Sequence, residues 1–148
     1  MTTKRIITLC ALLIPIVCSS QNIAIKLDCQ MSLSKQTSDG VTKQTFNENI
    51  EVTQKGEFLL ISFASGKITS LHTEKNKDVI EVMNLSDKDK WSIYRDYEKD
   101  GIKIRTSINI DRNNGSILVK EVSGYRSYNE ITESQGSCKK VDTTKRLF

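Results

Sequence analysis

Apolar and polar residues alternate with a period of two along much of the chain. Between residues 23 and 33 the odd positions are apolar and the even positions are mostly polar. The same pattern recurs between residues 102 and 111, where isoleucine occupies most of the even positions. Successive side chains of a β-strand point to opposite faces, so this alternation predicts half-buried antiparallel strands. A helix would scatter the same isoleucines around its circumference.

Shorter candidate strands fill the rest of the chain. They are predicted at residues 46–53, 57–64, 67–73, 79–85, 91–97 and 116–122, with a last one around Cys138. The segment 74–90 could instead hold a helical turn, and residues 125–135 are predicted to form a long loop or an edge strand.

Turn sequences separate the candidate strands. Asp-Gly and Asn-Gly pairs favour hairpin turns because these residues accept a positive φ. Turns are predicted at Ser38-Asp39-Gly40, Lys55-Gly56, Ser65-Gly66, Lys99-Asp100-Gly101, Asn113-Asn114-Gly115 and Ser123-Gly124. Short strands separated by such turns predict an all-β fold, namely a single-domain antiparallel meander that closes into a small soluble barrel or a sandwich.

The N-terminus has the residue order of a secretory signal peptide. Lys4 and Arg5 precede an apolar run over residues 6–17, and small and polar residues follow it. The apolar run is shorter than the ~20 residues that a membrane-spanning helix needs. We therefore expect export to the periplasm or the medium, with no membrane span after cleavage of the signal.

Cleavage is expected between Ser20 and Gln21, where small side chains precede the scissile bond. It divides the chain into a signal peptide, residues 1–20, and a single β domain, residues 21–148. The alternative is a lipoprotein acylated at Cys18. The residues before that cysteine do not fit a lipobox, so simple cleavage is favoured.

The cysteines predict one disulfide. Cys10 and Cys18 lie in the predicted signal peptide, which leaves Cys29 and Cys138 in the mature chain. An even pair of cysteines in an exported protein is expected to be bonded, because the export route is oxidising. The two residues are too far apart for a redox-active Cys-x-x-Cys motif. The bond would place the first strand beside the last, which favours a barrel, although a sandwich satisfies the same constraint.

Length and charge narrow the function classes. A chain of 148 residues corresponds to one domain. The whole sequence has 22 basic and 18 acidic residues, and loss of the signal leaves 20 basic residues. An excess of this size gives no reason to expect a nucleic-acid partner.

The sequence contains no recognisable catalytic or metal-binding motif. His72 is the only histidine, which excludes metal sites that need two and leaves one candidate general base. There is no Gly-x-Ser-x-Gly elbow and no glycine-rich loop before a helix. No catalytic residue, metal or cofactor is therefore predicted.

Aromatic residues supply the candidate contact site. Trp91, Tyr94 and Tyr97 fall close together and could contact a ligand or a partner protein. Trp91 and Tyr97 share the same strand parity, so packing in the core is the alternative for that pair, and Tyr94 would point the other way.

Two C-terminal segments resemble a type of small exported proteobacterial β-protein of unknown function. They are Ile110-Asp111-Arg112-Asn113-Asn114-Gly115 and Gly136-Ser137-Cys138-Lys139-Lys140, followed by Lys145 and Phe148. In that type a hydrophobic-Asp-Arg-x-x-Gly hairpin precedes a Gly-x-Cys segment. The resemblance covers the last third of the chain and implies no catalytic residue.

These observations favour a binding or interaction module over an enzyme. One hypothesis is a barrel that holds a small apolar ligand, which requires an apolar cavity. A second is a protein-binding module, such as an inhibitor of a cell-envelope or secreted hydrolase. A third is a hydrolase that uses a pair of carboxylates, which spacing alone does not exclude.

Overall fold

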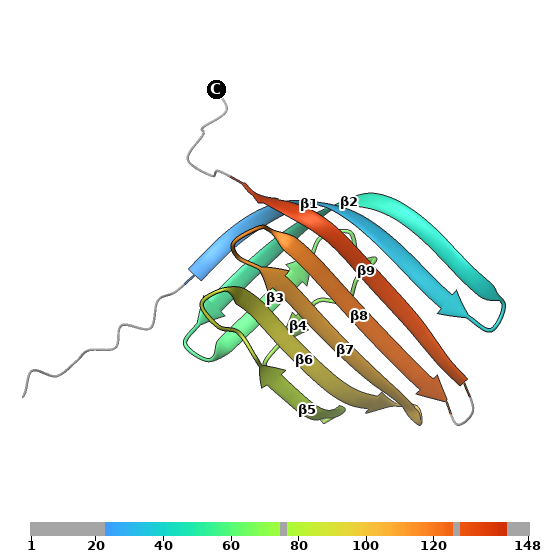
Figure 1. Ribbon diagram of the computed structural model, residues 1–148. Helices are drawn as coiled ribbons and strands as arrows, with labels where there is room; N and C mark the ends of the chain where they lie inside the picture. The colour runs from blue at the N-terminus through green and yellow to red at the C-terminus, as the bar shows by residue number, and fades with distance from the viewer. Residues whose placement is uncertain (1–22, 75–76, 126–127, 142–148) are drawn as a thin grey trace, which may run out of the picture.

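The part of the chain that the structure describes is an antiparallel half-barrel of nine strands (Figure 1). The computed structural model describes residues 23–74, 77–125 and 128–141. The strands are β1 (Ile23–Thr37), β2 (Gly40–Lys55), β3 (Phe58–Phe63), β4 (Leu71–His72), β5 (Val79–Asn84), β6 (Lys90–Lys99), β7 (Ile102–Asp111), β8 (Ser116–Tyr125) and β9 (Tyr128–Lys140). They form one sheet in the order β4-β3-β2-β1-β9-β8-β7-β6-β5. The predicted all-β meander is confirmed.

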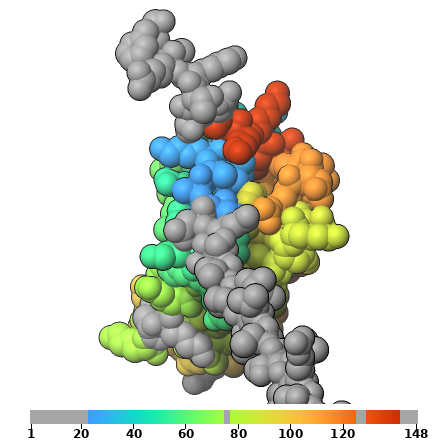
Figure 2. Space-filling view, turned by 90° about the vertical axis from the view of Figure 1, so that its left-hand side faces the viewer, coloured from blue at the N-terminus to red at the C-terminus, as the bar shows by residue number. Residues whose placement is uncertain are grey.

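The first and last strands lie side by side in the middle of the sheet. β1 pairs with β2 on one side and with β9 on the other. In the space-filling view, the blue start of β1 lies between the green strands and the orange and red C-terminal strands (Figure 2). β4 and β5 end the sheet, so the pairing of β1 with β9 does not itself join the two edges.

The predicted disulfide joins Cys29 of β1 to Cys138 of β9. The two residues are direct partners in the β1–β9 register, with 4.0 Å between their Cα atoms. Both side chains are buried in the core. The bond therefore links the two halves of the sheet at its centre. The predicted signal peptide, residues 1–20, lies outside the described residues.

Two sequence predictions near the C-terminus are wrong. Residues 128–140 form one continuous strand, β9, which is paired on both sides rather than forming a loop or an edge. Ser123-Gly124 is not a turn, because β8 continues through it to Tyr125. Both segments lie where the inner face of the sheet is polar. Their sequences therefore show no alternation of apolar and polar residues that would indicate a strand.

Two further segments differ in length from the prediction. The strand predicted at 67–73 is reduced to the two residues of β4, because residues 64–70 form a loop. The segment 74–90 contains β5 and, in its described part, no helical turn. The described residues include no helix with the length and apolar character that crossing a membrane requires.

The register sorts side chains into rows across the sheet, because paired residues point to the same face. Two inner-face rows are largely apolar and fill one end of the half-barrel. They are Trp91–Ile110–Ile117–Gly136–Met31–Phe46 and Ile93–Ile108–Val119–Ser134–Leu33–Gln44. Across them pack Ile50, Val52, Leu59, Ile61 and Leu71 of β2–β4, each at most 1% exposed. Each buried aliphatic side chain contributes about 1.5–3 kcal/mol.

One carboxylate lies within this core. Glu48 of β2 is 1% exposed and is the register partner of Cys29. The backbone N–H of Ser65 donates to Oε1 of Glu48 over 2.9 Å, and the Ser65 hydroxyl donates to Oε2. A buried carboxylate needs such donors because it has lost its hydration. Glu48 therefore anchors the 64–70 loop to β2.

Replacing Glu48 by alanine is expected to destabilise the fold by about 1–3 kcal/mol, since it removes both hydrogen bonds to a charged acceptor and leaves a cavity. Glu51→Ala is the matched control, because Glu51 lies on the same strand with an exposed side chain. Its expected effect is within about 0.5 kcal/mol. Urea unfolding measures both. Equal midpoints for the two variants would contradict the anchoring role.

Candidate functional site

The three aromatic residues predicted from the sequence do not share one surface. Trp91 is 6% exposed and belongs to the core, with the Arg112 guanidinium 4.7 Å from its ring centroid. Tyr97 lies on the same inner face, further along β6. Tyr94 points to the outer face. Burial raises the pKa of its hydroxyl, and the nearby Asp96 carboxylate raises it further.

Arg95 and Tyr97 mark where the inner face becomes polar. The Arg95 guanidinium carbon lies 4.7 Å from the centroid of the Tyr97 ring, which is a cation–π distance. Burial raises the pKa of the Tyr97 hydroxyl, the Glu121 carboxylate raises it further, and Arg95 opposes both. The Nε atom of Arg95 is buried and has no hydrogen-bond partner among the described residues.

Two carboxylates on this polar part of the inner face have separate partners. Glu121 accepts a hydrogen bond of 3.3 Å from the Thr106 hydroxyl. Glu130 forms an ion pair of 2.6 Å with Lys35. A carboxylate pair that hydrolyses a glycosidic bond would need the two carboxyl groups on opposite sides of that bond. Here both lie on the same face of adjacent strands, and each is held by its own neighbour.

His72 lies on the two-residue strand β4, opposite Leu60. Its Nδ1 atom is buried and has no hydrogen-bond partner among the described residues. Within residues 23–74, 77–125 and 128–141, no three His, Cys, Asp or Glu side chains are grouped so that they could hold a metal ion. The residues around His72 therefore offer no ligand set to a cation.

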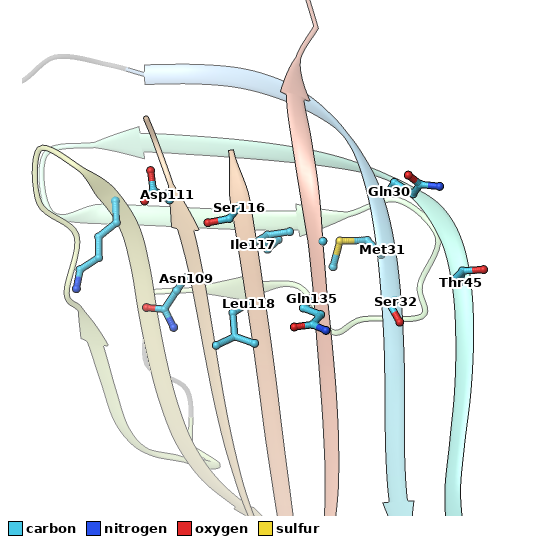
Figure 3. A pocket seen from close by; sticks show the side chains of 12 residues that line it. Gln30, Met31, Ser32, Thr45, Asn109, Asp111, Ser116, Ile117, Leu118 and Gln135 are labelled. Atoms are coloured by element: carbon cyan, nitrogen blue, oxygen red, sulfur yellow. The ribbon is translucent and has the colours of Figure 1, made fainter. Parts of the chain in front are cut away.

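A groove with a volume of about 790 Å³ crosses the outer face of the sheet. Figure 3 shows several of its labelled side chains in one row across the sheet. The row is Asn109–Leu118–Gln135–Ser32–Thr45, as the register requires. Gln30, Asp111 and Ser116 line one side of the row. Lys90 of β6 also lines the groove, which thus runs from β6 to Thr45 on β2.

The groove presents amides and hydroxyls, together with the charged side chains of Lys90 and Asp111 and the apolar side chain of Leu118. Asp111, its one carboxylate, is already occupied. One oxygen accepts hydrogen bonds from the N–H groups of Asn113 and Asn114, and the other accepts one from the Asn114 side chain. Asn109 accepts a bond of 2.7 Å from the Ser92 hydroxyl. The remaining amides and hydroxyls suit a neutral polar group or a peptide side chain.

The first half of β2 is paired on one side only. β1 pairs with β2 over its whole length, whereas β3 pairs only with residues 50–55. The β1–β2 hairpin consequently reaches past the end of β3 (Figure 1). Thr45, at the end of the outer groove, belongs to this half of the strand. The groove and the unpaired strand edge therefore adjoin.

Asn49 shows which backbone groups of β2 face away from β1. Its carbonyl oxygen accepts a hydrogen bond of 3.0 Å from the N–H of Ala64, next to β3. In an antiparallel strand the N–H and C=O of one residue point to the same side, and the side alternates along the chain. The groups directed away from β1 are therefore those of Val41, Lys43, Thr45 and Asn47. Among the described residues, none bonds to them.

The other edges of the sheet are short, capped or irregular. On β3, the Ser70 hydroxyl accepts a bond from the N–H of Phe63, and the Thr73 hydroxyl accepts one from the N–H of Leu59. β4 has two residues. β5 is interrupted by a register shift after Val79. Proteins protect sheet edges in these ways against unwanted strand pairing. The edge of β2 is long and regular and carries no hydroxyl cap from the described residues, and it bears one charged side chain, that of Lys43.

Comparison with known proteins gives no relative. The chain matches no family model, no curated protein sequence and no solved structure. The resemblance to small exported proteins therefore stays a prediction.

Proposed function

We propose that the protein is a binding module that captures an extended segment of another polypeptide as an additional strand on β2. The unpaired edge of residues 41–47 supports this proposal. Four residues on that edge offer both N–H and C=O in the spacing that a strand requires. Main-chain hydrogen bonds supply affinity in this mode of recognition, and alternate side chains supply specificity.

The surfaces beside the edge suit such a segment. The outer-facing side chains of an added strand would lie next to Thr45, where the outer groove ends. Its inner-facing side chains would lie next to Phe46, which is partly buried against the core. A module that captured a small apolar ligand would need an open apolar interior. In the described part of the chain, buried side chains fill the inner face at the apolar end.

Thr45→Pro tests the proposal directly. Proline removes the N–H that points away from β1 and places its ring where the added strand would lie, but it leaves the β1 pairing intact. The probe is a peptide of about nine residues in which valine alternates with threonine, followed through the backbone amide signals of the protein. We expect the peptide to shift the amides of the odd residues on the edge. Thr45→Pro should weaken binding about tenfold or more.

Thr45→Val is the matched control, because valine keeps the N–H and the strand preference. Its affinity for the peptide should stay within about twofold of the wild type. Urea midpoints near the wild-type value would show that both variants are folded. Wild-type affinity in Thr45→Pro, or peptide-induced shifts confined to another part of the sheet, would overturn the proposal.

We further propose that the module acts in an oxidising compartment outside the cytoplasm. The Cys29–Cys138 bond supports this, because disulfides persist mainly in such compartments. N-terminal sequencing of exported protein should begin at or within a few residues of Gln21. Recovery of the full-length chain from the membrane fraction would contradict cleavage and export.

A further inference from the structure

Two lysines flank the unpaired edge of β2, one on each face of the sheet. Lys43 lies on the edge itself, with an exposed side chain on the outer face. Lys67 lies in the 64–70 loop, and its Nζ atom is 4.5 Å from the ring centroid of Phe46 on the inner face. Among the described residues, neither lysine forms an ion pair.

The carboxylate closest to these lysines along β2 does not neutralise them. Glu48 is the one acidic residue between positions 40 and 49. It is buried, and its two oxygens accept hydrogen bonds from Ser65. Lys43 is therefore the only charge that this half of the strand shows to solvent, and Lys67 adds a second positive charge beside it.

A second copy of the chain is a poor occupant for this edge. In a two-fold antiparallel pairing the odd residues face one another, and the register that overlaps the whole of residues 41–47 has its axis at Gln44. An axis at Lys43 places the two lysines directly opposite each other, and an axis at Gln44 makes them diagonal neighbours. Like charges at such positions destabilise a strand pair, and edge lysines are a known means of preventing self-pairing.

We infer that the segment captured by β2 is acidic, with a carboxylate on each face of the added strand. The outer carboxylate would pair with Lys43 and the inner one with Lys67. A further inner-facing residue of the added strand, if apolar, would pack against Phe46. This inference rests on the proposed function and names the class of its partner. The positive charges of Lys43 and Lys67 disfavour basic segments and a second copy of β2. They therefore add selectivity to main-chain hydrogen bonds that any extended segment could form.

Three peptides test the inference. All share a frame of about nine residues with alternating valine and threonine, and differ at two adjacent positions that hold glutamate, glutamine or lysine. We expect affinity to fall in that order. The glutamate peptide should bind about fivefold more tightly than the glutamine peptide at low salt, because exposed ion pairs contribute modestly. This preference should shrink at about 0.5 M salt, where charges are screened.

Variants of the protein assign the preference to residues. Lys43→Gln should reduce the preference for the glutamate peptide about twofold without changing the affinity for the glutamine peptide. Lys67→Gln should also reduce the preference for the glutamate peptide about twofold. Lys67→Arg keeps the positive charge and should retain the wild-type preference. Lys103→Gln is the matched control, because Lys103 is an exposed lysine on β7, away from the edge. It should leave all three affinities unchanged.

Each outcome decides one question. Equal affinities for the glutamate and glutamine peptides, both protecting the odd amides of β2, would overturn the acidic partner and leave strand capture standing. Failure of every peptide to reach that edge would overturn strand capture itself. A wild-type dimer in sedimentation that is broken by Thr45→Pro would make a second copy the occupant and overturn the acidic segment.

Discussion

Replacing Cys29 and Cys138 together by serine is expected to lower the free energy of unfolding by about 2–5 kcal/mol. The bond closes a loop with a sequence separation of 109 residues, so its loss releases a large constraint on the unfolded chain. The bond also joins the two strands at the centre of the sheet. The double substitution leaves two buried hydroxyls where the sulfur atoms had been. Urea unfolding under non-reducing conditions measures the change.

The single variants Cys29→Ser and Cys138→Ser should lose about as much stability as the double variant, because either one breaks the same bond. Titration of the unfolded, unreduced wild type should find no reactive thiol in the mature chain. Two reactive cysteines, or a double variant that unfolds at the wild-type midpoint, would contradict the structural role of the bond.

Gly115→Ala is expected to cost about 2–4 kcal/mol. Gly115 has a φ of +73°, a conformation that strains most residues with a side chain, alanine among them. Its carbonyl also accepts a hydrogen bond of 2.8 Å from the N–H of Cys138, which holds the β7–β8 turn against β9. A Cβ atom at this position would run into the carbonyl oxygen of Cys138. Backbone strain and steric displacement therefore add together.

Gly101→Ala separates these two contributions. Gly101 has nearly the same φ, +76°, but a Cβ atom there would meet nothing within 4 Å. Its expected cost is the backbone strain alone, about 1 kcal/mol. Both variants are measured by urea unfolding. Equal losses at the two glycines would show that the contact with Cys138 relaxes freely.

The part of the fold that could be predicted is the part with one apolar face. Alternation located β1 up to Leu33 and almost all of β7, because their inner-facing side chains enter the core. Residues 34–37, 40–45 and 129–135 are strand as well, yet most of their side chains are polar or exposed. A pattern that depends on burial does not mark such strands. They are held by pairing with neighbours, and the sequence of one segment does not record that pairing.

Parts of the candidate site were accessible to the same parity argument. Trp91 shares its face with Ile93 and is buried, as core packing required. Glu48 could have been found in the same way, since it lies between Phe46 and Ile50 on the buried face of β2. The outer groove could not be predicted from the sequence, because it depends on the register of five strands. The unpaired edge could not be predicted either, because it depends on where β3 ends.

Residue-resolved amide hydrogen exchange tests the central proposal, strand capture at β2, most directly. In the free protein, the amides of Val41, Lys43, Thr45 and Asn47 should exchange nearly unprotected, whereas those of Gln44 and Phe46, which face β1, should be protected. Addition of the glutamate peptide should protect the odd amides and leave the even ones unchanged. Equal protection of both sets in the free protein, or no gain of protection at the odd amides with peptide, would contradict the account.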